Sequence, residues 1–257
     1  MSTLLTENSD APGARESVPK DVKPQCSECP VAKFGIYQST MTSSPERVTG
    51  FRTKVVSYQP HRTILHEGQS SEEFGSIRSG WAYAFTQLPD SRRHIQGFMI
   101  PGDTVVLDLL NIGPFPISFG VKALTDATVC WFPAPHMRKI LFSEPAQRRE
   151  TQYWMAYYWA ALNHRAAAIA RSDARSKVAH FFVEMLGRLR HRGLVKDDGF
   201  EFFATQEQIG DCLGLTSVYI NRMLSHLKQR GILEIGDKTL RVFDEQALIA
   251  IADERHE

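Results

Sequence analysis

Between about residues 55 and 132, short apolar runs alternate with turn residues. The runs are Thr63–His66, Gly75–Ile77, Trp81–Phe85, His94–Ile100, Thr104–Val106 and Ala127–Phe132. The breaks between them carry glycine, which permits positive backbone φ at tight corners. These breaks are Glu67-Gly68, Ser79-Gly80 and Pro101-Gly102-Asp103. Short strands at such regular spacing predict a sandwich or small barrel that can hold a small ligand.

The pattern changes after Pro135 and predicts one long helix. No glycine occurs from about Glu144 to Arg171, and the only proline, Pro145, comes early. Apolar residues recur every seven positions on one face of this helix, and further apolar residues fall between them. This is the pattern of a coiled-coil seam, here with a second copy of the chain. The seam residues are Met155, Tyr158, Trp159, Leu162 and Ile169. The alternative is that the helix packs on its own barrel. A second helix is expected from 173 to about 191, after a hinge and cap near Ser172.

Residues 205–243 predict a helix-turn-helix followed by a two-stranded wing. Thr205 and Gln208 have the spacing of a capping box, and Gly214 ends the first helix. The second helix begins near Thr216 or Ser217 and buries an apolar stripe. The stripe consists of Ile220, Met223, Leu224 and Leu227. The wing is expected at 232–235 and 238–243, joined by a turn at Gly236-Asp237. The alternative is an ordinary helical hairpin with a solvated charged face.

The outward face of the second helix contains no acidic residue, which favours contact with DNA. Arginine and lysine meet phosphates, and arginine and asparagine have the geometry to read guanine and adenine. The candidate contacts are Ser217, Tyr219, Asn221, Arg222, Ser225 and Lys228, with Lys238 on the wing. Lys228 and Lys238 are expected on phosphates, and Asn221 and Arg222 on bases.

Composition is consistent with a globular protein of more than one domain. The chain has 257 residues, 42% hydrophobic and 23% charged, and a formal net charge of +1. Affinity for DNA must therefore come from a local patch. We find no apolar run of membrane-spanning length and no signal peptide, so we expect no membrane partner and a cytoplasmic location. In that reducing compartment, the four cysteines are expected to be thiols or ligands and not structural disulfides.

The fold class expected from these patterns is α+β. We divide the chain into a flexible leader (1–45), a strand-rich sensor domain (46–142), a dimerisation helix (143–171) and a winged helix-turn-helix domain (172–257). Enzyme motifs are missing and the nine histidines look scattered, so we expect no catalytic activity. His66 or His94 could face the barrel cavity and bind haem or another ligand, although a lone histidine is usually structural.

With its glycine corners, long helix and the motif Ile209-Gly-Asp-Cys-Leu-Gly-Leu-Thr216, the chain resembles the CRP/FNR family of bacterial transcription regulators. The resemblance implies a sensory β-roll, which is a cyclic-nucleotide-binding-like jelly roll. It also implies a homodimer on a palindromic DNA site, with contacts to RNA polymerase. It places base-reading residues at Ser217, Val218, Asn221 and Arg222. Val218 replaces the family's usual glutamate and can contact a thymine methyl, so a TGA-type half-site is not expected. A sensory or scaffolding module that has lost DNA binding is the alternative.

The resemblance also suggests effectors. Ile117-Ser118 stands where the family's arginine-serine pair holds the phosphate of cyclic AMP, and Leu107-Asp108 replaces a glycine-glutamate pair, so cyclic AMP is not expected. In the FNR branch, four cysteines hold an iron–sulfur cluster that senses oxygen. Cys26, Cys29 and Cys130 match three of the four, and Gly35 takes the fourth place. A three-cysteine cluster, a thiol switch at Cys26 and Cys29, and a remnant without chemistry remain open. The signal would be oxygen, redox state or nitrogen oxides. Cys212 is expected in the core.

Overall fold

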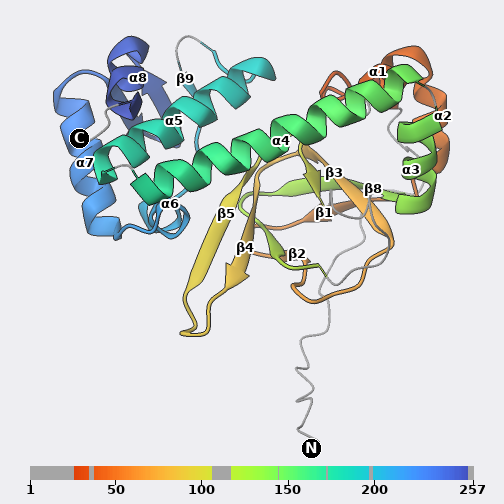
Figure 1. Ribbon diagram of the computed structural model, residues 1–257, viewed down its shortest axis with the longest axis horizontal. Coiled ribbons are helices and arrows are strands. Elements are labelled where there is room, and N and C mark those ends of the chain that lie inside the picture. Colours follow the sequence, from red (N-terminus) through yellow and green to blue (C-terminus); the bar gives the residue numbers. More distant parts are fainter. Residues whose placement is uncertain are drawn as a thin grey trace, which may run out of the picture.

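A computed structural model of the chain describes residues 26–34, 38–105, 117–143, 145–171, 173–196 and 199–253. These residues form an N-terminal strand-rich domain, one long helix and a smaller C-terminal domain (Figure 1). The α+β class predicted from the sequence is confirmed. Leu107, Asp108, Gly35 and Ser172 lie outside the described residues.

The N-terminal domain is a roll of two antiparallel four-stranded sheets. Their strand orders are β1-β8-β3-β6 and β2-β7-β4-β5. The strands are β1 (Lys54–Tyr58), β2 (Thr63–Leu65), β3 (Glu73–Ser79), β4 (Ala82–Gln87), β5 (Arg93–Met99), β6 (Thr104–Val105), β7 (Gly120–Ala123) and β8 (Ala127–Pro133). Phe74, Ile77 and Val129 are fully buried between them. Gly80 is required at its corner, because its φ is +77° and a Cβ there would lie 2.0 Å from the Asp126 carbonyl oxygen.

Short helices precede the roll, within and beside the segment predicted to be a flexible leader. They are the 3₁₀ turn η1 (Cys26–Glu28), α1 (Gln38–Ser43) and α2 (Pro45–Phe51). Cys26, Met41 and Val48 are buried in the core of the roll. The leader prediction is therefore wrong for the described part of 26–45, because apolar side chains spaced along this segment pack over the central strands β3 and β8.

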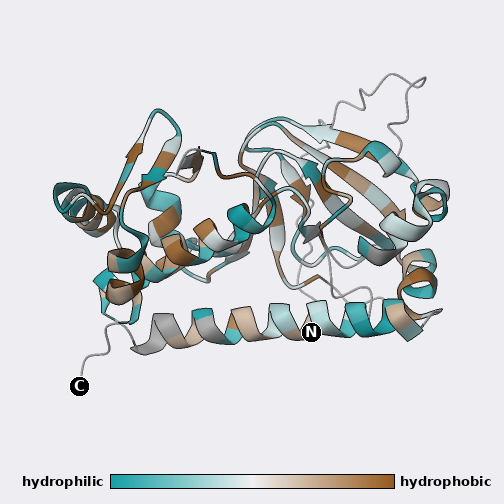
Figure 2. Cartoon of the chain, turned by 90° about the horizontal axis from the view of Figure 1, so that it is seen from above, coloured by the Kyte–Doolittle hydropathy of each residue, from teal (hydrophilic) through white to brown (hydrophobic). Residues whose placement is uncertain are grey.

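Helix α3 (Ala134–Ser143) leads into α4 (Pro145–Arg171), which has 27 residues. Viewed from above, α4 forms one long side of the molecule, and both domains lie on the other side of it (Figure 2). Its inward stripe includes the buried residues Gln147 and Thr151. Tyr158 continues that stripe and packs against the core of the roll, so its assignment to the intersubunit seam is wrong. The side chain of Ile169 is outside the described set.

Helix α5 (Ala174–His191) begins the C-terminal domain. Its N-cap is Asp173, whose Oδ1 accepts a hydrogen bond from the Ser176 amide at 2.7 Å. The remaining elements are β9 (Gly199–Glu201), α6 (Gln206–Leu213), α7 (Ser217–Gln229), β10 (Leu233–Gly236), β11 (Thr239–Val242) and α8 (Glu245–Asp253). The wing has three strands in the order β10-β11-β9, not the two predicted. β9 was missed because a three-residue strand carries almost no periodicity.

The two domains share a continuous apolar core. Trp81, just before β4, contacts the rings of Phe202 and Phe203, and Phe98 of β5 contacts Phe181 of α5. The outer face of the β4–β5 hairpin therefore packs directly on the C-terminal domain. Within the described residues, no helix has both the length and the apolar character that crossing a membrane requires.

Candidate nucleic-acid interface and cysteine site

Two capped helices and a tight turn build the helix-turn-helix. Thr205 Oγ1 accepts from the Gln208 amide at 3.2 Å, and Gln208 Oε1 accepts from the Thr205 amide at 2.9 Å. This is the predicted capping box. Gly214 ends α6 with φ +67°. Thr216 then caps α7 by accepting from the Tyr219 amide at 3.3 Å.

A second glycine of the motif sets how closely the turn approaches α6. A Cβ on Gly210 would lie 2.4 Å from the Leu215 carbonyl oxygen, which no side chain tolerates without a backbone shift. In the sequence, Gly210 stands in the motif without a predicted role of its own. The close approach fixes the angle between α6 and α7, and this angle determines how α7 projects from the domain.

Helix α7 buries Ile220, Met223 and Leu227 and leaves its opposite face in solvent. Val218 is 78% exposed. The Arg222 guanidinium lies 4.6 Å from the centre of the Tyr219 ring, a cation–π contact that holds it against the helix surface. Among the predicted contacts on α7, only Tyr219 is partly buried. The exposed ones are Ser217, Val218, Asn221, Arg222, Ser225 and Lys228.

The wing brings a positive charge at its tip and an acidic residue that pairs with Lys228 of α7. Asp237 and Lys238 both have positive φ, +50° and +58°, which is the two-residue turn that suits a hairpin. The turn lies one residue later than predicted and places exposed Lys238 at the tip of the wing. Lys228 Nζ pairs with Glu234 Oε1 of β10 at 2.5 Å. The acid that meets Lys228 comes from the wing, so inspection of α7 alone could not reveal it.

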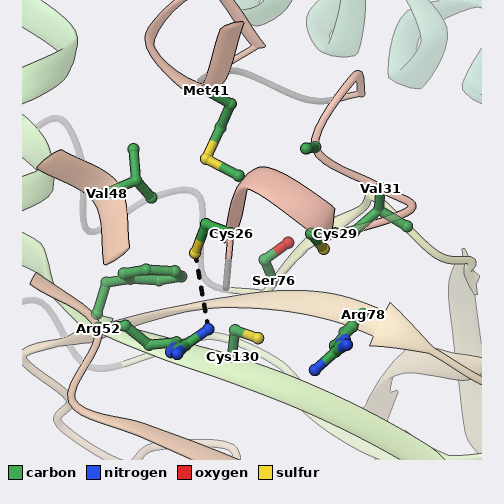
Figure 3. Close-up of a pocket in the computed structure, with 11 residues that line it drawn as sticks. Cys26, Cys29, Val31, Met41, Val48, Arg52, Ser76, Arg78 and Cys130 are labelled. Carbon is green, nitrogen blue, oxygen red and sulfur yellow. Dashed lines mark hydrogen bonds between the residues drawn. The ribbon is translucent and has the colours of Figure 1, made fainter. Parts of the chain in front are cut away.

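The three N-terminal and roll cysteines line one small cavity. Cys26 and Cys29 lie on and just after η1, and Cys130 lies on β8 opposite Ser76 of β3. Figure 3 shows them facing one another together with Arg52 and Arg78. Arg52 Nη1 donates to Cys26 Sγ at 3.6 Å.

The donor set does not fit a four-iron cluster as it stands. All four cysteines of the chain are free thiols, and among the residues described here no three His, Cys, Asp or Glu side chains are placed to hold a metal ion. The cavity has a volume of about 20 Å³, roughly the space of one water molecule. Burial raises the pKa of Cys130 to about 11, so this thiol is protonated at neutral pH in the metal-free protein.

The remaining candidate residues, which are Cys212, two histidines and Ile117, lie outside the cysteine cavity. Cys212 is 2% exposed in α6, and burial raises its pKa to about 12. His66 is exposed, and the ring Nδ1 of His94 lies 3.1 Å from the Asp211 carbonyl oxygen. Neither histidine lines the cysteine cavity, and ligand binding by either of them stays a prediction. Ile117 is buried in the core of the roll and brings no cation to the place of the family's arginine.

Ion pairs that the sequence did not predict join the roll to the C-terminal domain. Arg93 Nε on β5 meets Asp211 Oδ2 of α6 at 2.6 Å. On the other side, Asp103 of the β5–β6 turn receives Arg188 Nη2 at 2.6 Å and Arg192 Nη2 at 2.5 Å, both from the end of α5. These pairs fix the orientation of the helix-turn-helix relative to the roll.

Comparison with known proteins matches two family descriptions. Residues 55–144 match the cyclic nucleotide-binding domain, and residues 176–251 match the Crp-like helix-turn-helix domain. The transcriptional activator protein FnrA of Stutzerimonas stutzeri is 24% identical over 190 residues, which are 74% of this chain and 77% of the relative. The fumarate and nitrate reduction regulatory protein of Escherichia coli K12 is 23% identical over 227 residues, 88% of this chain and 90% of the relative.

Solved structures show the same architecture. FixK2 from Bradyrhizobium japonicum matches with a TM-score of 0.70 and 25% identity, covering 80% of this chain and 99% of that one. A CooA mutant from Carboxydothermus hydrogenoformans matches in fold, with a TM-score of 0.67, 17% identity and coverage of 85% and 96%. Together with the capped helix-turn-helix, the roll and the long helix between them, these matches establish that the chain belongs to the CRP/FNR family of transcription regulators.

Proposed function

We propose that this protein binds a palindromic DNA site as a homodimer, reads it with α7, and responds to redox state through its cysteine site. The exposed face of α7 is the observation that carries the DNA-binding part. Asn221 and Arg222 are both in solvent, the helix contains no acidic residue, and caps hold both helices of the motif. A face of this kind fits the major groove and meets both bases and phosphates.

The side chains of α7 indicate what the helix reads. Tyr219 restricts Arg222 to a stacked position, from which its guanidinium can make paired hydrogen bonds to guanine. Asn221 can make the corresponding pair with adenine. Val218 projects an apolar surface suited to a thymine methyl and offers no acceptor for cytosine. Lys238 at the wing tip would meet backbone phosphate. Lys228 can do so when its bond to Glu234 opens.

The outer face of α4 supports the dimer. Met155, Trp159, Leu162 and Ala166 follow one another at spacings of four, three and four residues, which is the coiled-coil pattern. Trp159 is 70% exposed and Leu162 is 54% exposed. In the single chain these side chains leave a large apolar strip in water, and a second copy of α4 packed along it would bury the strip. The helix is about 40 Å long, so two copies can hold two recognition helices one DNA turn apart.

A single charge in this strip tests the dimer. Leu162→Glu would bury two carboxylates against each other in the seam, so we expect a monomer in sedimentation velocity and a loss of operator binding. The matched control is Leu88→Glu, because Leu88 is 36% exposed on the β4–β5 hairpin, outside the strip. The control is expected to remain dimeric and to bind DNA. A Leu162→Glu protein that stays dimeric would refute this interface.

For the signal, we propose thiol oxidation at Cys26 and Cys29. Cys29 is half-buried, two residues separate it from Cys26, and its amide donates to the Cys26 carbonyl at 3.2 Å. Two guanidinium groups line the same cavity and can neutralise an anionic oxidation product. One hydrogen peroxide would oxidise one thiol to a sulfenic acid and release a water. The second thiol would then form the disulfide and release a second water.

The segment that contains these cysteines also contacts the DNA-binding domain. The ring of Phe34 lies 5.9 Å from that of His191 at the end of α5, measured between ring centres. A Cβ on Gly102 would lie 3.1 Å from Phe34 Cβ and 3.2 Å from Arg192 Nε, so the segment, the roll and α5 meet closely here. A disulfide that changes the turn at Cys26–Cys29 would therefore be transmitted to α5.

Two measurements on one preparation test the signal. After anaerobic purification we expect less than one iron per chain, and after peroxide treatment we expect a Cys26–Cys29 disulfide by peptide mass spectrometry. Cys29→Ser should lose both the disulfide and the effect of peroxide on DNA binding. A protein with four irons and four sulfides per chain would instead favour the cluster, for which the convergence of three cysteines is the supporting observation.

Two further expectations belong to the same proposal. Cyclic AMP is not the effector, because buried Ile117 replaces the arginine that would hold its phosphate. A calorimetric titration with tight cyclic AMP binding would overturn this. As a transcription regulator the chain would also contact RNA polymerase, which a pull-down with purified polymerase on operator DNA would detect.

A further inference from the structure

A second and larger cavity lies where the roll, α4 and α5 meet. Its volume is about 160 Å³, and it is separate from the cysteine cavity. The helices that bound it lie side by side in Figure 1. α4 contributes four aromatic side chains to its wall. They are Tyr153, Trp154, Tyr157 and Tyr158.

Two buried donors at this cavity have no partner. Among the described residues, Tyr158 Oη and Arg192 Nε are both shielded from solvent and make no hydrogen bond. The Arg192 side chain is only 8% exposed. Buried polar groups in proteins are normally hydrogen-bonded, since leaving a donor unsatisfied costs free energy. Desolvation raises the pKa of the Tyr158 hydroxyl, which therefore remains a donor at neutral pH. Both groups need an acceptor.

The charge and the volume of this cavity limit which ligand it can bind. The ion-pair network at the cavity joins three arginines, Arg165, Arg188 and Arg192, to two carboxylates, Asp103 and Glu184, which leaves one positive charge in excess. An apolar cavity of about 150 Å³ accepts one benzene ring. Aromatic walls favour a flat ring stacked or set edge-on against them. We propose that this cavity is a binding site for a small aromatic carboxylate, whose ring packs on the α4 aromatics and whose oxygens accept from Tyr158 and Arg192.

Dimer formation does not cover this site. Tyr153 and Tyr157 are 65% and 45% exposed and lie on the flank of α4 opposite the strip that contains Trp159. Both line the cavity. Because its walls come from the roll turn, α4 and α5 together, a bound ligand contacts all three parts. The cavity shares His191 and Arg192 with the contact between the Phe34 segment and α5.

Calorimetry with benzoate and the full-length protein tests the site without DNA. We expect one benzoate per chain, saturating in roughly the millimolar range for so small a ligand. Tyr158→Phe removes one hydrogen-bond donor and leaves the ring, so it should weaken binding up to about tenfold. The matched control is Tyr58→Phe, a partly buried tyrosine on β1 away from the cavity. Its affinity for benzoate should equal that of the wild type.

Further comparisons keep the test independent of folding. Tyr157→Leu removes a wall ring near the surface and should also weaken benzoate. Benzylamine, with the same ring and opposite charge, should bind less tightly than benzoate. The proposal is overturned if benzoate shows no saturable binding, if benzylamine binds better, or if the Tyr158 and Tyr157 variants bind as the wild type does. Since DNA is absent from this measurement, its failure leaves the regulator proposal untouched.

Discussion

At the scale of single residues, Arg222 and Val218 determine which DNA sequence is read. We expect Arg222→Ala to lower affinity for the selected operator by about 1–3 kcal/mol and to leave affinity for random DNA little changed, because the lost contact is to a base. Competition binding with both DNAs measures the difference. An equal loss on both would show that Arg222 contacts only phosphate.

Val218→Glu should add a base contact, whereas Arg222→Ala removes one. It restores a hydrogen-bond acceptor to a side chain that is 78% exposed. A glutamate there can accept from the amino group of cytosine, so repeated selection should yield a half-site with cytosine or its partner guanine at that position. An unchanged half-site would mean that residue 218 does not reach the bases.

Lys238 should contribute equally to the affinity for every DNA sequence. Lys238→Ala is expected to weaken binding to every duplex and to reduce the dependence of affinity on salt, because a phosphate contact releases counterions. The slope of affinity against salt concentration, compared with the wild type, measures the effect. Sequence-dependent losses would contradict it.

The thiols should differ in reactivity. The buried Cys130 and Cys212, with pKa values raised to about 11 and about 12, are almost entirely protonated at pH 8. We therefore expect iodoacetamide to modify half-buried Cys29 first. The folded state holds these two protons more tightly, so their stabilising contribution is complete below the pKa of the unfolded thiol. It is lost as pH rises through about 11 for Cys130 and about 12 for Cys212. Rapid labelling of Cys130 at pH 8 in folded protein would disprove this burial.

At the scale of elements, Gly210 sets the angle between α6 and α7. Gly210→Ala places a Cβ against the Leu215 carbonyl, and we expect it to lower the free energy of unfolding by about 2 kcal/mol or more and to abolish DNA binding. Gly187→Ala is the matched control, since a Cβ on Gly187, inside α5, would meet no atom within 4 Å. Urea titration should show the control unchanged or more stable, because alanine favours helix. Equal stabilities would refute the close approach.

The helix-turn-helix could be predicted in detail because its signals are local. The capping box, Gly214 and the buried stripe of α7 each depend on residues a few positions apart. The long helix was harder. Tyr158 and Trp159 are adjacent and both aromatic, yet one packs on the roll and the other is 70% exposed. With aromatic residues on several faces, the sequence pattern could not separate the inward stripe from the seam.

Contacts between distant segments could not be predicted from periodicity. The pair Arg93–Asp211 joins residues 118 positions apart, and neither position carries a local signal. The convergence of the cysteines was predicted through family resemblance, and their surroundings were not. Arg52 and Arg78 approach from α2's end and β3, and only the folded chain brings them to the thiols.

At the scale of the whole molecule, Asp103 couples the roll to the DNA-binding domain. Asp103→Asn would remove the countercharge of buried Arg192 and leave Arg188 with only its longer pair to Glu184 at 3.7 Å, so we expect a loss of about 3 kcal/mol in the free energy of unfolding. Asp90→Asn, which breaks the exposed pair with Arg92 at the hairpin tip, is the control and should have no measurable effect. Chemical denaturation of the three proteins measures this. A wild-type stability for Asp103→Asn would mean that the junction contributes little.

Selection from a random-sequence duplex library, followed by the mass of the selected complex, tests the central claim most directly. Two α7 helices held by paired α4 helices should recover an inverted repeat with half-site centres about 10 base pairs apart, bound by two chains per duplex. Recovery of no preferred sequence, or of a single half-site bound by one chain, would contradict it.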